Sequence, residues 1–452
     1  MTNVADAAPV SGQTQPPARR SIGGLIAQTE IDLRLFGMLL ALGLILLTFN
    51  ILSGGKFFQP TNMVTLAVQA SGIAIIATGM VLVIVSRNID LSVGSLVGLI
   101  AMTYALLMTD VMPRILGMGP DFPFRWLIAL GLGILLGAGV GALQGYIIAY
   151  VGVPSFIVTL GGLLSIRGAI WYMSNGAAVS GLDPIFQLIG GGAKGSVGGT
   201  LTWVLGVVGC IAIIALLLNG RRQRRHFGFP LRPMWAEVLL GVIGSIAVLG
   251  LAAFANANLW PKGISGGLDI PTGVPYPIVL LIGVTLVMTW LATRRRFGRY
   301  VYAYGGNPDA AELAGINTRR TVLKVYVVMG ILCALAAAIA VARLNTATLD
   351  IGQSYELYVI AAAIAVARLN TATLDVGQSY ELYVIAAAVV GGTSFAGGIG
   401  SIAGAVLGAF VMQSLAYGLS FMGVNSPGQN VVAGIVLILA VGFDAYNRRR
   451  GS

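Results

Sequence analysis

Residues 126–150 read WLIALGLGILLGAGVGALQGYIIAY, a run without a single charged side chain. The run exceeds the roughly 20 mostly apolar residues that an α-helix needs to cross a bilayer. Glycine recurs at every fourth position, and so lines one face of such a helix, at Gly133, Gly137, Gly141 and Gly145. Small residues on one face let two membrane helices approach closely. The run therefore predicts a membrane-spanning helix that packs tightly against a neighbour.

The composition of the whole chain extends this interpretation. Of the 452 residues, 57% are hydrophobic and only 10% are charged, whereas about a quarter of the residues of a soluble domain are charged. So few charges cannot cover a water-facing surface of this size, and lipid must surround most of it. A second set of small residues with the same spacing, Gly400, Gly404 and Gly408, lies in another apolar run.

Further apolar runs predict an all-α integral membrane protein, a polytopic bundle of about 10–12 transmembrane helices, some short or re-entrant. The expected spans are 33–51, 63–85, 93–109, 126–150, 156–173, 201–218, 236–256, 276–293, 321–342, 401–421 and 426–444. A shorter apolar piece at 381–392 is expected to form a half-span.

Basic residues between the runs predict the orientation. If the N-terminus lies inside and the spans alternate, 18 of the 27 Lys and Arg fall inside, 5 fall outside and 4 stay unassigned, as the positive-inside rule requires. Residues 1–30 are expected to form a disordered cytoplasmic tail; a cleaved signal peptide is the alternative, but the first apolar run starts too late for one. The membrane domain then occupies 31–447, and a basic cytoplasmic tail occupies 448–452.

A tandem duplication stands out near the C-terminal end. Residues 336–360 recur at 361–385 with one difference, Ile351 against Val376. An extra crossing would place the basic C-terminal tail outside, against the charge rule. We therefore expect the extra copy to add no net crossing and to form a packed re-entrant or peripheral segment.

The loop at 294–324 reads RRRFGRYVYAYGGNPDAAELAGINTRRTVLK. Asn307 can cap a helix that starts at Pro308, with acidic residues in its first turn, and Gly315 can end it. The pattern predicts a short cytoplasmic helix over 308–314. The residues alone favour an ordinary surface helix between two spans. The less favoured interpretation is a helix that a partner protein binds and moves.

The run GGNPDAAELAGIN, Gly305–Asn317, closely resembles the coupling segment of permeases in the bacterial ribose/xylose class of ABC importers. In that family the segment docks into a cleft of the ATPase subunit. By position, the resemblance implies a docking surface made of Asn307, Pro308, Ala310, Ala311, Leu313, Gly315 and Ile316.

A second match is RNIDLSVGS, Arg87–Ser95, where the family usually shows Gly-Gly-Ile-Asp-Leu-Ser-Val-Gly. Arg87 and Asn88 replace the two glycines, which puts the local backbone turn in doubt. The matching residues that the resemblance places near the transport pathway are Asp90, Leu91, Ser92 and Gly94. An ionisable residue at the membrane is costly and usually functional. Asp90 can also serve as a helix cap, and the two roles can coexist.

Two more runs resemble the family, VPSFIVTLGGLLSIRG (Val153–Gly168) and YELYVIAAAVVGGTSFAGGIGSIAGA (Tyr380–Ala405). The stretch 175–270 resembles only the longer members, which include the D-xylose and multiple-monosaccharide permeases. The resemblance implies a permease subunit of an ATP-driven importer for monosaccharides, D-xylose or a related sugar, in the bacterial inner membrane. The implied partners are a separate ABC ATPase, a periplasmic sugar-binding protein, a second permease copy in a homodimer and membrane lipid, with no nucleic acid.

No GxxxxGK[ST] phosphate loop occurs in the chain, so the chain itself is not expected to bind ATP or to be an enzyme. The lone His226 lies in an Arg-rich loop, and Cys210 and Cys333 are expected to be small core residues. We therefore expect no catalytic residues, no metal and no cofactor. An ion-coupled secondary transporter is the alternative function, with Asp90 and the duplicated pair Glu356 and Glu381 as its carboxylates.

Overall fold

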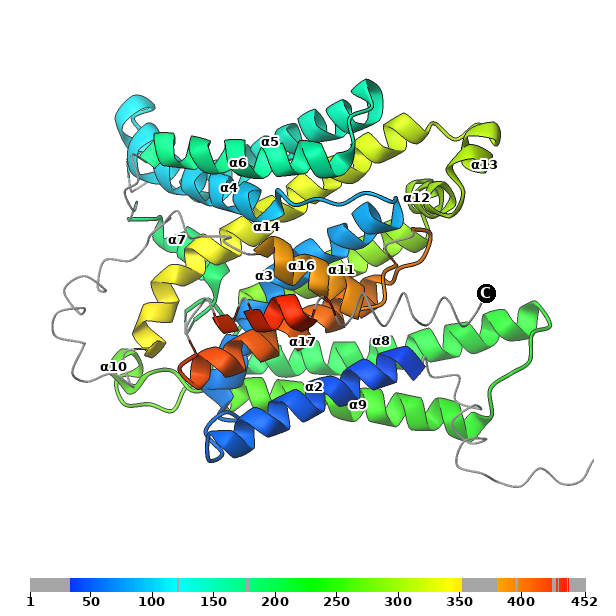
Figure 1. Cartoon of the computed structure of the whole chain (residues 1–452). Coiled ribbons are helices and arrows are strands. Elements are labelled where there is room, and N and C mark those ends of the chain that lie inside the picture. The colour runs from blue at the N-terminus through cyan, green and yellow to red at the C-terminus, as the bar shows by residue number, and fades with distance from the viewer. Residues whose placement is uncertain are drawn as a thin grey trace, which may run out of the picture. The chain divides into compact units, whose positions relative to one another are not determined.

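The computed structural model describes residues 33–119, 122–174, 179, 181–192, 194–351, 380–394, 397–424, 428–429, 431–436 and 438. The helices (Figure 1) are, in chain order, α2 (Leu33–Leu52), α3 (Pro60–Val85), α4 (Val93–Leu106) with the π-helix η1 (Leu107–Ile115), α5 (Arg125–Tyr146) with the π-helix η2 (Ile147–Val151), α6 (Ser155–Ser174), α7 (Pro184–Gln187) with the 3₁₀-helix η3 (Leu188–Gly190), α8 (Gly199–His226), α9 (Met234–Asn256), α10 (Lys262–Ser265), α11 (Tyr276–Thr293), α12 (Arg296–Gly306), α13 (Pro308–Leu313), α14 (Thr318–Ile351), α16 (Tyr380–Val390) and α17 (Ile402–Phe421).

Ten helices in the described part of the chain are long and apolar enough to cross a membrane. They coincide with the first ten predicted spans, which confirms the all-α polytopic membrane fold. The predicted half-span is also present, as the short helix α16. The predicted span at 426–444 lies largely outside the described residues, as do both predicted tails and most of the duplicated copies.

The chain divides into two compact units, and α3 lies at the centre of the larger one, which comprises residues 33–207 and 249–452. Every side chain of α3 from Ala70 to Val85 is buried. The helices that surround it are α11, α14, α16 and α17. A helix that is apolar all round belongs in the interior of a bundle, which is where α3 lies.

The predicted glycine faces are helix contacts of the larger unit. α5 packs along α14, and a Cβ built at Gly137 or Gly141 would overlap the carbonyl oxygen of Gly330 or Tyr326. α17 meets α16 in the same way, since a Cβ at Gly404 or Gly408 would overlap a backbone carbonyl of α16 or of the residue after it. Only glycine allows such backbone contact between helices.

The smaller unit contains residues 208–248, a pair of neighbouring helical segments from α8 and α9. Arg221 and Glu237 form an ion pair across it at 2.8 Å. The Cys210 thiol, half-buried, lies 3.8 Å from the carbonyl oxygen of Ser245. Cys210 is therefore a helix-contact residue and not the core residue that we predicted, whereas Cys333 is buried as predicted; both are free thiols.

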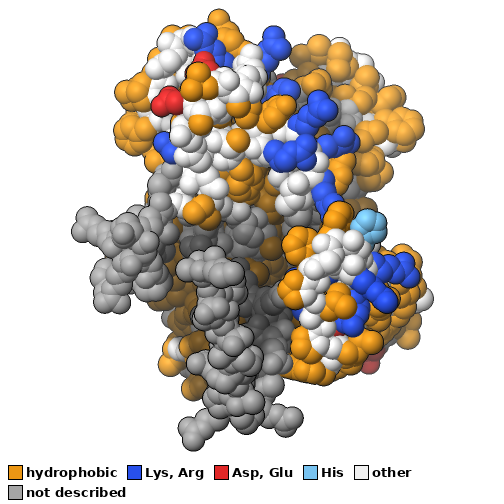
Figure 2. Space-filling view, turned by 90° about the vertical axis from the view of Figure 1, so that its right-hand side faces the viewer, with side chains coloured by type: hydrophobic (Ala, Val, Ile, Leu, Met, Phe, Trp, Pro, Cys, Tyr) orange, Lys and Arg blue, Asp and Glu red, His pale blue; other side chains and the backbone are white. Residues whose placement is uncertain are grey.

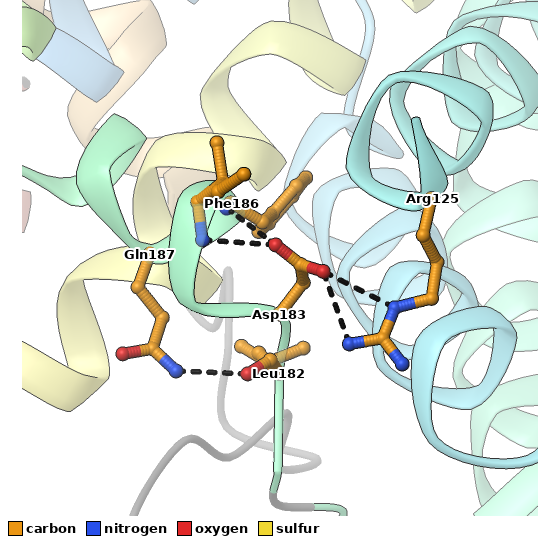
Figure 3. Close-up of polar contacts among 6 residues, drawn as sticks. Arg125, Leu182, Asp183, Phe186 and Gln187 are labelled. Atoms are coloured by element: carbon orange, nitrogen blue, oxygen red, sulfur yellow. Dashed lines mark hydrogen bonds and ion pairs between the residues drawn. The ribbon is translucent and has the colours of Figure 1, made fainter. Parts of the chain in front are cut away.

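A buried ion pair fixes the start of α5 in the larger unit (Figure 3). The guanidinium of Arg125 donates to Asp183 Oδ2 from Nε at 3.1 Å and lies 3.0 Å from it through Nη2. The other carboxylate oxygen of Asp183 accepts the N–H groups of Ile185 and Phe186 and so caps α7. Each of the two charged side chains is only 5% exposed. Both charges are thus compensated, which a buried ion pair requires.

Candidate functional site

We use the name basic end for the end of the larger unit that holds α12, α13 and the start of α14, on the right in Figure 1. Figure 2 looks onto this side, where Lys and Arg side chains gather. The exposed basic residues of these elements are Arg294, Arg295, Arg296, Arg299, Arg319, Arg320 and Lys324. Their concentration between two spans matches the charge expected of a cytoplasmic loop.

The predicted short helix of this end is α13. The Asn307 side chain accepts the Ala310 N–H at 3.0 Å and caps its start. The helix ends at Leu313, and the backbone of Gly315 is left-handed, with φ of +81°. The Gly315 N–H also donates to the Glu312 carbonyl at 2.9 Å. Cap, helix and glycine stop are all as the sequence predicts.

The side chains of α13 differ strongly in their exposure to solvent. Leu313 is 90% exposed, whereas Ala311 is 5% exposed and faces inward. The other predicted docking residues are exposed or half-exposed, namely Asn307, Pro308, Ala310, Gly315 and Ile316. An apolar side chain held out at the tip of a capped helix is the kind of group that a partner's pocket accepts. The docking role of these residues stays a prediction.

Arg87 links the end of α12, directly before α13, to the end of α3. Its Nε donates to the Gly305 carbonyl at 2.7 Å and its Nη2 to the Gly306 carbonyl at 2.8 Å. Among the described residues, Arg87 is the only non-glycine residue with a positive φ, +61°. The glycine that the family usually carries here would adopt this conformation without strain. The turn therefore survives the substitution, and the arginine adds two hydrogen bonds to the backbone just before α13.

Two tyrosines of α12 lie at the same junction. The Tyr302 hydroxyl donates to the Gly400 carbonyl at 2.8 Å. Burial raises the pKa of the Tyr304 phenol, while the charge of Arg87 lowers this pKa and that of Glu312 raises it. Both phenols are therefore neutral at physiological pH, and the hydrogen bond from Tyr302 that holds α12 to Gly400 is a neutral one.

The left-handed turn at Arg87 leads to a measurable prediction. Arg87→Ala and Arg87→Gly both remove the hydrogen bonds to the 305 and 306 carbonyls, but only glycine relieves the left-handed backbone. We expect Arg87→Gly to be more stable than Arg87→Ala by about 1 kcal/mol. Thermal unfolding of the purified variants in detergent measures this difference. Equal stability of the two variants would show that the φ at position 87 is not strained.

Residues 86–92 run as a non-helical segment from the end of α3 back toward the start of α4 (Figure 1). Asp90 is buried, and its Oδ1 accepts both the N–H of Ser92, at 2.8 Å, and its hydroxyl, at 2.7 Å. Gln144 of α5 donates to the Ser92 hydroxyl at 2.9 Å. Asp90 therefore shapes the turn before α4, which begins at Val93. Leu91 is half-buried in this segment, and Gly94 is buried in the first turn of α4.

Side chains of two other helices, α6 and α14, pair with the backbone groups of Ile89 in this segment. The Ile89 N–H donates to Ser155 Oγ at 3.3 Å. The Ile89 carbonyl accepts from Thr159 at 3.3 Å and from Tyr326 at 3.4 Å. Tyr326 lies eight residues into α14, about 12 Å along it. Irregular backbone at membrane depth is tolerated only where protein groups pair with it, so these side chains are part of the site.

The sequence had not pointed to Gln144, Ser155, Thr159 or Tyr326 as partners of this segment. Their one sequence signal is that they are polar side chains within apolar runs. Together with Arg87, they connect the 86–92 segment to α12, α5, α6 and α14. The described residues include no group of three His, Cys, Asp or Glu side chains that could hold a metal. The arrangement is suited to transmitting a displacement between these helices.

Known proteins resemble this chain over most of its length. The model of a family described as branched-chain amino acid transport system / permease component matches residues 62–181 and 184–365. The xylose transport system permease protein XylH of Escherichia coli (strain K12) is 36% identical over 428 residues, 95% of this chain and 96% of that protein. The protein of the same name from Haemophilus influenzae is 33% identical over 93% of this chain and 98% of its own length.

A more distant relative is the ribose import permease protein RbsC of Escherichia coli (strain K12). It is 31% identical over 390 residues, 86% of this chain and 87% of its own length. No solved structure matches the chain.

Proposed function

This chain belongs to the branched-chain amino acid transport system / permease component family, and we propose that it is the permease subunit of an ATP-driven ABC importer for monosaccharides. Two such chains form the pathway as a homodimer, a separate ABC ATPase supplies the energy, and a periplasmic binding protein delivers the sugar. The names of its relatives, xylose and ribose permeases, support a sugar as substrate. The higher identity to the xylose permeases favours D-xylose or a related pentose.

One observation carries the proposal, the capped helix α13 with its exposed Leu313 at the basic end. The chain has no phosphate-binding loop, so ATP must act through another subunit, and that subunit needs a contact that protrudes from the membrane. α13 provides such a contact, and Arg87 joins it to the segment that holds Asp90. Movement of α13 can thus reach the interior of the bundle.

We further propose that the basic end faces the cytoplasm of the bacterial inner membrane, with both termini on that side. The density of exposed Arg and Lys at this end supports this orientation. Lipid surrounds the exposed apolar side chains of the outer helices, of which Leu44, Leu135 and Leu251 are examples.

Reconstitution tests the function directly. Purified permease, ATPase and binding protein are combined in proteoliposomes, and uptake of radiolabelled D-xylose, D-ribose and D-galactose is followed with ATP or ADP. We expect uptake that requires ATP and the ATPase. Uptake driven by a proton or sodium gradient without ATP would contradict the importer and support an ion-coupled secondary transporter.

The duplication gives a second prediction. Deletion of residues 361–385 joins Ile360 to Ala386 and places Glu356 at the sequence position of Glu381, because the two copies match there. We expect the shortened chain to keep ATP-driven uptake, since removal of one copy changes no net crossing. Uptake in proteoliposomes and protease access to a C-terminal tag measure activity and orientation. Complete loss of uptake in a stably inserted deletion variant would contradict the prediction.

A further inference from the structure

Among the described residues of the larger unit, one ion pair is both open and deep in the membrane domain. Arg167 of α6 and Glu381 of α16 lie 3.8 Å apart, from Nη2 to Oε1. Arg167 lies 12 residues from the start of α6, about 18 Å, and Glu381 lies nine residues from the end of α16, about 14 Å. Both of these helix termini lie toward the basic end. Because the hydrocarbon core is about 30 Å thick, the two helices independently place the pair near its middle.

The hydrogen-bonding capacity of this pair is largely unused. The Arg167 side chain is 45% exposed, and its guanidinium has five N–H donors. The Oε2 atom of Glu381 is buried and has no hydrogen-bond partner among the described residues. Donors and an acceptor therefore lie side by side at membrane mid-depth.

The ion pair at the far end of the same unit shows what a purely structural pair looks like in this protein. Arg125 and Asp183 are 3.0 Å apart and 5% exposed, and the second carboxylate oxygen of Asp183 caps α7. The pair of Arg167 and Glu381 is longer, open on the arginine side and incomplete on the carboxylate side. A charge at the bilayer centre is too costly to face lipid tails, so the open side of Arg167 must face water or polar groups.

We propose that Arg167 and Glu381 line the water-filled translocation pathway and bind hydroxyl groups of the monosaccharide as it passes. This inference rests on the proposed function. A sugar hydroxyl both donates and accepts a hydrogen bond, so one hydroxyl can accept from the exposed Arg167 guanidinium while it donates to the Glu381 carboxylate. The exposed ring of Trp171, one helical turn after Arg167, offers an apolar surface to the C–H face of the same sugar.

Cysteine accessibility tests the first part. In a chain with Cys210→Ala and Cys333→Ala, Arg167→Cys is compared with Ala169→Cys, an exposed position two residues further on α6 and so on the other flank of the helix. The reagent is a small membrane-impermeant methanethiosulfonate, applied to vesicles that contain the assembled complex. We expect modification at position 167 only, slowed by D-xylose. No modification at position 167, or equal rates at both positions, would overturn the inference.

A double variant separates sugar binding from a structural role. Arg167→Met with Glu381→Leu removes both charges together, so neither charge is left without its partner in the membrane domain. We expect an unchanged melting temperature and an uptake rate lowered about 10- to 100-fold, from the loss of hydrogen bonds to charged groups. Wild-type uptake by the double variant would show a structural pair and overturn the inference.

Glu356→Gln is the matched control for Glu381→Gln, because the same sequence surrounds both residues. We expect only Glu381→Gln to lower uptake; the opposite result would reject Glu381 as the sugar ligand. The labelling needs no ATP. Failure of the labelling alongside intact ATP-driven uptake therefore rejects this inference alone, whereas wild-type uptake without any need for ATP rejects the proposed function.

Discussion

Leu313→Asp is expected to abolish ATP-driven sugar uptake while the protein still inserts and folds. Leu313 is 90% exposed at the tip of α13, so a carboxylate there meets only water in the isolated permease. In the complex, the same carboxylate would enter an apolar pocket of the ATPase. Loss of such an anchor costs about 2–4 kcal/mol, or about 30- to 1,000-fold in docking affinity. Co-purification of the ATPase and ATP-driven uptake in proteoliposomes are the measurements.

Two controls separate docking from folding. Leu313→Met keeps an apolar side chain of similar volume and should keep uptake. Leu268→Asp places the same charge on another exposed leucine, in the loop after α10, and should also keep uptake. Normal coupled uptake by Leu313→Asp would mean that α13 is not the docking segment.

The docking surface predicted from the sequence needs one change. It includes Ala311, but Ala311 is buried, so a charge there would disturb the packing of α13 itself. Gly315→Pro is a useful second variant. Proline cannot adopt a φ of +81°, and it lacks the N–H that Gly315 donates to Glu312. We expect it to abolish coupling.

Gly141→Leu is expected to prevent folding altogether. A Cβ at this position would overlap the carbonyl oxygen of Tyr326 in α14, and a leucine adds three more carbon atoms in the same place. Overpacking of an interior costs about 1–3 kcal/mol even where side chains can adjust, and here the obstacle is backbone. The variant should yield no monodisperse protein on size-exclusion chromatography in detergent.

Gly139→Leu is the matched control, since Gly139 lies on the exposed face of the same helix with no atom within 4 Å of its Cβ position. It should express and elute as the wild type does. A folded Gly141→Leu protein would show that α5 and α14 do not touch through their backbones.

Apolar run length was sufficient to predict the ten long helices of the described residues, and glycine spacing predicted that the helix at 126–150 packs tightly against a neighbour, but not that this neighbour is α14. The cap at Asn307 and the stop at Gly315 were equally predictable, because both act over a few neighbouring residues. The environment of Arg87 was not, since its partners Gly305 and Gly306 lie 218 and 219 residues away. No periodicity in a single sequence reports a contact of that range.

The same limit applies to the ion pair within the membrane. Arg167 and Glu381 stand in different apolar runs, and neither run indicates that the two charges meet. The sequence comparison also could not show that Ala311 faces inward, because adjacent positions of a single helical turn look alike in a resemblance. Residues whose roles depend on neighbours in space were therefore the ones that required the structure.

The backbone contact between α5 and α14 also restricts how this protein can move. The main chains of α5 and α14 touch at Gly137, Gly141 and Gly330. The two helices therefore cannot slide or roll past each other without collision, and they move as one rigid body. α13 is connected to α14, and so to this rigid pair of helices, through the four residues 314–317. On the proposed function, a push on α13 would therefore tilt both helices together, and the accompanying bending would fall on the non-helical residues 86–92 and on the short helix α16.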